Sequence, residues 1–106
     1  MADFDYDIAV VGGGPGGYVA AIRGAQLKHR VAVIEDNELG GVCLNWGCIP
    51  TKSLLVNAHV LDLVKNAKKF GIHIDSYEVD WGKVIKRSRD VAKRLSKGIE
   101  YLMKKN

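Results

Sequence analysis

Residues 6–17 read YDIAVVGGGPGG, and this stretch decides the fold of the chain. A short run of apolar and β-branched residues that ends in glycines is typical of a buried parallel strand at the start of a βαβ unit. Residues 18–27 follow as YVAAIRGAQL, which is rich in small residues, as a helix packed tightly on a sheet requires. Residues 31–34, VAVI, then predict a second buried strand. The pattern predicts an α/β fold that opens with two parallel strands and a connecting helix.

The glycines between the first strand and the helix have the spacing G-x-G-x-x-G, formed by Gly12, Gly14 and Gly17. Gly12 permits a sharp turn, Gly14 lets a pyrophosphate approach the backbone, and Gly17 lets the helix pack closely on the strand. Pro15 sets a helical φ without the loss of a needed donor. The N–H groups at a helix start favour phosphate. We therefore expect a dinucleotide to bind at this turn.

Glu35 directly follows the second predicted strand. This position is about 20 residues beyond the glycine turn, where an acidic side chain can bind an adenosine ribose. A purely structural glycine turn and a plain surface role for Glu35 are the weaker alternatives. The turn does not by itself distinguish FAD from NAD. The link 28–30 has no glycine, so we expect one of its residues to adopt the left-handed conformation.

Residues 39–52 read LGGVCLNWGCIPTK and contain both cysteines of the chain, Cys43 and Cys48. In a regular helix, Cα atoms five positions apart lie about 8.7 Å from each other. A disulfide needs roughly 4.4–6.8 Å between its Cα atoms. A bond between these cysteines therefore requires a distorted segment. Flanking glycines and a helix start suit such a bond to exchange more than to bracing.

Three other interpretations of the cysteines stay open on the residues alone. A metal site would need further ligands, and His59 and His73 have no recognisable spacing to the pair. A structural disulfide is uncommon in chains with a cytosolic character. Two unpaired buried thiols are the third alternative. We favour an exchange-active pair and expect no metal.

The remaining sequence predicts an ordered functional loop at 36–48 and two helices, at 48–71 and 80–104, each with apolar residues at helical spacing. The first helix should end at Phe70-Gly71, and Asp80 should cap the start of the second. We interpret Trp81 and Tyr101 as packing residues. The expected architecture is a βαβ unit followed by two helices.

The composition is that of an ordinary globular chain, with 106 residues, 47% hydrophobic content and a formal net charge of +4. One domain of this size has a modest core. The basic residues of the second half fall at helical spacing and are interrupted by Asp90 and Glu100, which indicates a solvated face without nucleic acid. An acidic start and no apolar run of about 18 residues favour a cytoplasmic protein without a membrane contact.

The pattern Gly-Gly-x-Cys-x-Asn-x-Gly-Cys-Ile-Pro at 40–50 resembles the flavoprotein disulfide reductase family, and the resemblance covers nearly the whole chain. Residues 43–55 and the early GGGPGGYVAA at 12–21 are most similar to the dihydrolipoamide dehydrogenases of this family. Glutathione and mercuric reductases commonly show Val-Asn-Val-Gly-Cys-Val-Pro and are less similar. Trp46 departs from the valine often found at its position.

The resemblance assigns FAD to the first dinucleotide fold and implies roles for three side chains. Cys43 would be the interchange thiol that forms a mixed disulfide with a dithiol substrate. Cys48 would contact the isoalloxazine, and Lys52 would approach the reactive flavin nitrogen, where its charge favours the reduced form. The implied FAD-binding residues are Gly12, Gly14, Pro15, Gly17, Glu35, Asp36, Gly41, Val42, Cys43 and Lys52.

The implied activity passes electrons from dihydrolipoamide through the Cys43–Cys48 disulfide and FAD to NAD. In the family, NAD binds at a second glycine turn and the base is a histidine near the far end; none of His29, His59 and His73 matches it. We therefore expect residues 1–106 to be the N-terminal part of an FAD-binding domain, incomplete and without turnover alone.

The implied partners are a dihydrolipoamide-bearing protein or a small dithiol, with a homodimer for the full-length protein and a possible 2-oxo acid dehydrogenase complex. Two alternatives belong to other classes of function. The chain could be a separate FAD-binding or thiol-exchange module, or a plain NAD-binding domain with incidental cysteines. Flavin absorbance distinguishes a plain NAD-binding domain from a member of the flavoprotein disulfide reductase family.

Overall fold

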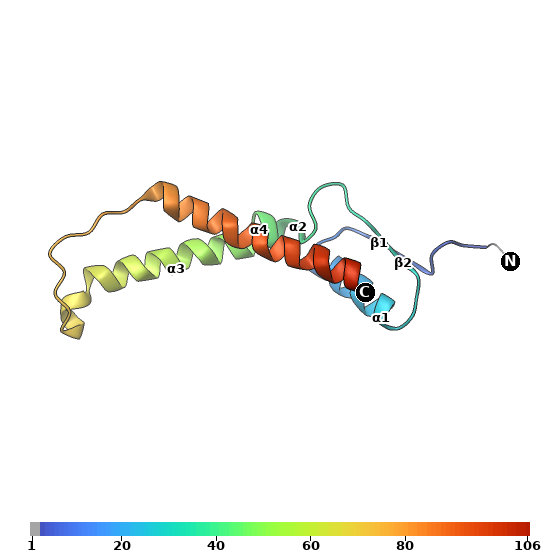
Figure 1. Cartoon of the computed structure of the whole chain (residues 1–106), viewed down its shortest axis with the longest axis horizontal. Coiled ribbons are helices and arrows are strands. Elements are labelled where there is room, and N and C mark those ends of the chain that lie inside the picture. The colour runs from blue at the N-terminus through green and yellow to red at the C-terminus, as the bar shows by residue number, and fades with distance from the viewer. Residues whose placement is uncertain (1–2) are drawn as a thin grey trace.

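The first half of the chain forms the predicted βαβ unit in a computed structural model that describes residues 3–106. Strands β1 (Ile8–Val11) and β2 (Val31–Ile34) pair in parallel, with Ile8 opposite Val31 and Val11 opposite Ile34. Helix α1 (Pro15–Gln26) connects them (Figure 1). The prediction of an α/β fold with this opening is confirmed.

Three local features fix how α1 and the strands meet. Gly24 is buried, and a Cβ atom there would lie 3.0 Å from a methyl group of Val31, so the small residue permits close packing. Lys28 has a φ of 70°, which confirms the expected left-handed residue in the link without glycine. At the start of the strands, the Asp7 carboxylate accepts a hydrogen bond of 2.7 Å from the Arg30 backbone N–H.

The second half is helical and corrects the predicted boundaries. Helix α2 (Gly41–Asn45) lies inside the stretch predicted as a loop. Helix α3 (Cys48–Lys65) ends before Phe70, and a 3₁₀ turn (Ala67–Phe70) continues it to Gly71, whose φ of 74° ends the helical backbone. Helix α4 (Trp81–Lys105) starts as predicted, because the Asp80 carboxylate accepts a hydrogen bond of 3.0 Å from the Lys83 N–H.

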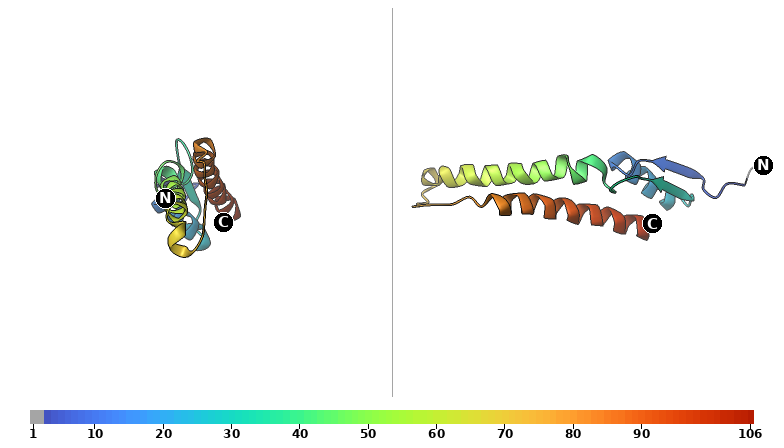
Figure 2. Two further views of the ribbon diagram at one scale, coloured as in Figure 1. Left: turned by 90° about the vertical axis from the view of Figure 1, so that its left-hand side faces the viewer. Right: turned by 90° about the horizontal axis from the view of Figure 1, so that it is seen from above.

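Helices α3 and α4 run antiparallel and form a long hairpin (Figure 2). The molecule measures 75 × 24 × 18 Å, and its radius of gyration is 20.3 Å. A compact domain of similar length has a radius of about 13 Å. The apolar core is correspondingly small, as its size predicted, and consists of Ala21, Leu44, Ala67, Ala92 and Ile99.

The contact face of α4 is built mainly from small residues rather than from its large apolar ones. Ser88, Ala92 and Ser96 recur every fourth residue and are buried, which lets neighbouring backbones approach. Trp81 is 68% exposed and Tyr101 is 64% exposed. Their interpretation as packing residues is therefore wrong within this chain. None of the helices in residues 3–106 is long and apolar enough to cross a membrane.

Candidate functional site

The glycine turn joins β1 directly to the start of α1. A Cβ atom at Gly17 would lie 1.8 Å from the carbonyl oxygen of Gly12, so only glycine allows this approach. The Gly12 N–H donates a hydrogen bond of 2.8 Å to the carbonyl oxygen of Ile34, which ties the turn to the end of β2. Within the described residues, no side chain caps the start of α1 at Gly14. This helix start can therefore receive an anion.

Glu35 lies beside the turn and is half-buried. Its carboxylate accepts a hydrogen bond of 2.7 Å from the Gly13 N–H and one of 3.0 Å from the Asn37 N–H. The Gly13 contact first, and the Asn37 contact second, lower the pKa of Glu35. The structure thus holds an ionised carboxylate at the edge of the turn, next to the exposed Asp36.

The segment with the cysteines rests on the same turn. The Gly40 N–H donates a hydrogen bond of 2.8 Å to the carbonyl oxygen of Gly13. Gly41 has a φ of +58°, and a Cβ atom there would lie 2.8 Å from the Cα atom of Gly14. The structure therefore brings the two motifs together through backbone contacts. Sequence reasoning predicted each motif but not this contact.

The two cysteines lie on different helices. Cys43 is in α2, Cys48 is the first residue of α3, and the helical backbone breaks at Trp46 and Gly47. The distortion that a disulfide would require is therefore present. Both residues are thiols in this structure, with Cys43 half-buried and Cys48 exposed.

The chemistry of the Cys43 thiol depends on its surroundings. A hydrogen bond with the Cys48 side chain is the main cause that raises the pKa of Cys43, and burial raises it further. The positive charge of Lys52 lowers it by a smaller amount. Lys52 is exposed one helical turn after Cys48, on the same side of α3.

A network of polar side chains supports this segment, and sequence reasoning missed it. The Asn45 amide donates to the carbonyl oxygens of Leu39 and Gly41, at 3.1 and 2.9 Å. From α4, the Ser96 hydroxyl donates to the Leu39 carbonyl oxygen at 2.6 Å, and the Arg89 guanidinium donates to the Asn45 carbonyl oxygen at 3.3 Å. The regular spacing of small residues in α4 was the available signal.

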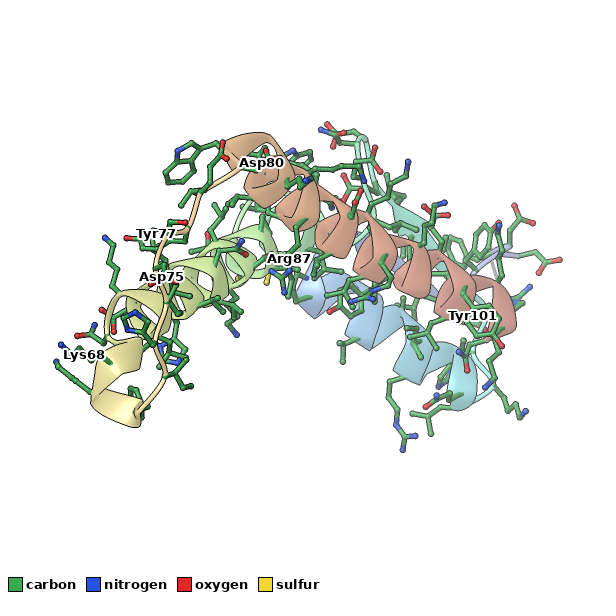
Figure 3. All side chains as sticks on the ribbon, turned by 60° about the vertical axis from the view of Figure 1, so that its left-hand side comes forward. Lys68, Asp75, Tyr77, Asp80, Arg87 and Tyr101 are labelled. Atoms are coloured by element: carbon green, nitrogen blue, oxygen red, sulfur yellow. The ribbon has the colours of Figure 1, made fainter. Side chains whose placement is uncertain are left out.

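Arg87 makes the corresponding contacts with α3, toward which it points (Figure 3). Its guanidinium donates to the Ser53 hydroxyl at 2.8 Å, to the Ser53 carbonyl oxygen at 3.2 Å and to the Asn57 side chain at 3.1 Å.

Val42, another residue predicted to bind FAD, is 68% exposed on α2. His59 lies on α3 and His73 in the extended connection before α4.

Comparison with known proteins agrees with this geometry. The pyridine nucleotide-disulphide oxidoreductase family matches residues 6–106. The dihydrolipoyl dehydrogenase of Zymomonas mobilis is 55% identical over 106 residues, which are 100% of this chain and 22% of that protein. That of Chlorobaculum tepidum is 51% identical over 94% of this chain and 21% of its own length. The mitochondrial dihydrolipoyl dehydrogenase of Schizosaccharomyces pombe is 51% identical over 96% of this chain and 20% of its own length.

The chain spans about a fifth of the length of these relatives. The shared part includes the glycine turn, both cysteines and the helical hairpin, because the match extends over residues 6–106. The observed βαβ unit and the helices after it match the start of an FAD-binding domain of this kind. The chain belongs to the pyridine nucleotide-disulphide oxidoreductase family.

Proposed function

We propose that this chain is the FAD-binding and dithiol part of a dihydrolipoyl dehydrogenase, which transfers electrons from dihydrolipoamide through Cys43 and Cys48 to FAD and then to NAD. In this proposal residues 1–106 belong to one FAD-binding domain, and 39–52 is its redox segment. The observation that carries the proposal is the position of the two cysteines on either side of a helix break, in a segment that rests directly on the glycine turn.

The turn fits the pyrophosphate of a dinucleotide. A Cβ atom at Gly14 would lie 3.9 Å from the Cα atom of Gly41, an ordinary van der Waals contact, so the turn is not crowded before the start of α1. Backbone N–H groups at an uncapped helix start supply donors for phosphate oxygens. Glu35, held by Gly13, would accept from the ribose, and Lys52 would lie near the flavin. Asp36, Gly41 and Val42 complete the proposed FAD-binding residues.

The cysteines supply the thiol chemistry. A substrate thiolate attacks the Cys43 sulfur of the oxidised pair, the Cys43–Cys48 bond breaks, and Cys48 leaves as a thiolate. The second substrate thiolate then attacks the first substrate sulfur, closes the substrate disulfide and releases Cys43. The substrate loses two electrons and two protons, and the cysteine pair gains the two electrons. Bound FAD would accept these electrons and pass them to NAD.

The raised pKa of Cys43 determines the protonation of its thiol after the substrate disulfide has formed. A thiol with a raised pKa takes up a proton when it is released, and the hydrogen bond with the Cys48 sulfur favours that protonated form. Cys48 is the more exposed of the two and is accessible to a flavin from one side. The substrate would be dihydrolipoamide, carried by a protein of a 2-oxo acid dehydrogenase complex, or a small dithiol. The complete protein would act as a homodimer.

The natural polypeptide that contains these residues tests the proposal. We expect it to purify with flavin absorbance and to reduce NAD with dihydrolipoamide. Cys43→Ser and Cys48→Ser should each lower turnover by at least about a thousandfold, because removal of one nucleophile abolishes the disulfide route. Both variants should retain FAD, which shows that the loss is chemical.

Three outcomes would contradict the proposal. Turnover within tenfold of the unmodified protein in either cysteine variant would exclude the disulfide route. Preference for glutathione disulfide or a mercuric ion over dihydrolipoamide would assign another branch of the family. NAD binding without any flavin would assign a plain NAD-binding domain.

A further inference from the structure

We propose that α4 clamps the two helices that carry the cysteines, and that Ser96 is a positioning residue which sets the stability of the Cys43–Cys48 disulfide. The inference rests on the proposed function, because it requires that this pair cycles between dithiol and disulfide. It assigns a role to α4, whose residues contribute no atom to the glycine turn or to the sulfur pair.

Helix α2, which carries Cys43, is held by α4 at both of its ends. Before its start, the Ser96 hydroxyl donates to the Leu39 carbonyl oxygen at 2.6 Å. At its end, the Arg89 guanidinium donates to the Asn45 carbonyl oxygen at 3.3 Å. Ser96 is 5% exposed, so water cannot easily replace its hydroxyl.

Helix α3, which carries Cys48, is held by the same helix. Arg87 donates to the hydroxyl and the carbonyl oxygen of Ser53, at 2.8 and 3.2 Å, and Ser53 is 6% exposed. Ser53 lies five residues beyond Cys48 in the first turns of α3. The only chain link between the two cysteine helices is Trp46 and Gly47. Helix α4 therefore connects α2 and α3 through side-chain hydrogen bonds, in addition to the covalent link at Trp46 and Gly47.

The clamp acts on the disulfide through the position of the sulfur atoms. In the disulfide the sulfur atoms are about 2.05 Å apart, so α2 must stay close to α3 for the bond to form without strain. A scaffold that holds two thiols together raises their effective concentration and favours the bond. Loss of the Ser96 contact removes one of the restraints on the start of α2, while the Gly40–Gly13 and Asn45–Leu39 hydrogen bonds remain. The effective concentration of the two thiols falls, and the equilibrium shifts toward the dithiol.

The experiment measures this equilibrium in the natural polypeptide with dithiothreitol as the exchange partner. Oxidised dithiothreitol gains two electrons and two protons as the pair loses them, and the cysteines form one S–S bond. Alkylation after acid quenching, followed by mass measurement of the peptide with Cys43 and Cys48, gives the fraction oxidised. This readout does not depend on turnover.

The test variant is Ser96→Ala, and the matched control is Ser88→Ala. Both are serine-to-alanine changes in buried positions of α4, but the Ser88 hydroxyl donates only to the carbonyl oxygen of Ile85 in its own helix, at 2.8 Å. In Ser96→Ala the Leu39 carbonyl oxygen still accepts from Asn45, so no buried acceptor is left unsatisfied. Arg89→Gln, at an exposed position, is the second test variant.

We expect Ser96→Ala to lower the equilibrium constant for disulfide formation about three- to tenfold, where tenfold corresponds to roughly 30 mV. Arg89→Gln should lower it about twofold, and Ser88→Ala should leave it unchanged. Equal constants in all four proteins, or equal decreases in Ser96→Ala and Ser88→Ala, would overturn the clamp. If the unmodified protein formed no Cys43–Cys48 disulfide, the proposed function and the clamp would both be wrong.

Discussion

The two ends of this elongated molecule are held together by different kinds of contact. At the end with β1 and β2, positions are fixed by backbone contacts that a single Cβ atom would disrupt, as at Gly17 and Gly41. At the far end of the hairpin, α3 and α4 diverge around an open, largely apolar groove of about 630 Å³ lined by side chains such as Leu61 and Ile85. The proposed site therefore lies at the end where close backbone contacts leave no room for a side chain at Gly17 and Gly41.

The strongest test of this difference is Gly17→Ala. Its new methyl group would meet the Gly12 carbonyl, a backbone atom that cannot move without displacing β1. We expect the free energy of unfolding to fall by about 3 kcal/mol or more. Gly16→Ala is the control, because a Cβ atom at Gly16 would meet nothing within 4 Å. Thermal unfolding of the natural polypeptide measures the stability of both variants. Equal melting temperatures for Gly17→Ala and Gly16→Ala would show that the close backbone contact at Gly17 does not limit stability.

A side-chain substitution at the end with β1 and β2 should have a smaller effect than Gly17→Ala. Glu35→Gln removes a charged acceptor from Gly13 and from the proposed ribose contact, and should weaken FAD binding roughly tenfold at pH 7. Since the pKa of Glu35 is lowered, its contribution to stability is complete above its ordinary value of 4.5 and is lost as the pH falls through the lowered value. The melting temperatures of the two proteins should therefore converge at acidic pH.

Titration of apoprotein with FAD at pH 7, followed by melting curves between about pH 3 and 7, measures these effects. Glu38→Gln serves as a control, since Glu38 is an exposed carboxylate near Glu35 that is not among the proposed FAD-binding residues. A gap between unmodified and Glu35→Gln proteins that widened toward low pH would contradict the assigned direction of the pKa shift.

Asp80→Ala tests the other end of the molecule. It removes the side chain that accepts from the Lys83 N–H at the start of α4, and should lower the free energy of unfolding by about 1 kcal/mol. Denaturant unfolding measures the loss. Asp90→Ala, an exposed change inside the same helix, is the control. FAD affinity should stay unchanged in Asp80→Ala; a tenfold loss would show that the two ends are coupled more tightly than their contacts indicate.

The smallest expected effect concerns the two thiols. In reduced protein freed of flavin, an alkylating reagent should modify Cys48 about threefold faster than Cys43, because Cys48 is exposed and a raised pKa leaves less Cys43 thiolate. Bound FAD should reverse this order by covering Cys48. Peptide mass measurement at several times gives both rates. An order that FAD does not change would contradict the proposed position of the flavin.

Sequence reasoning predicted the parts of the molecule that depend on local pattern. The βαβ unit, the left-handed residue at Lys28 and the cap at Asp80 each follow from neighbouring residues. The short helix α2 was missed, because glycines at 40, 41 and 47 are as typical of loops as of helix breaks. The end of α3 at Lys65 was missed because the 3₁₀ turn after it continues the helical backbone to Gly71.

Contacts between distant segments could not be predicted in the same way. A serine inside a helix pattern carries no sign that its hydroxyl will meet a carbonyl 57 positions away, as Ser96 meets Leu39. The exposure of Trp81 was mispredicted for a related reason, since apolar periodicity identifies a face but not what covers it. The proximity of Gly14 and Gly41 likewise became visible only in three dimensions.

That proximity has a practical meaning for protein engineering. Because Gly40 bonds to Gly13 and Gly41 touches Gly14, the segment 39–52 depends on the glycine turn as well as on its own hydrogen bonds. Moving 39–52 alone into another protein would leave these glycines without the surface they rest on. The smallest module for a designed thiol-exchange domain extends from β1 through the first turn of α3, with α4 or a substitute helix to hold it.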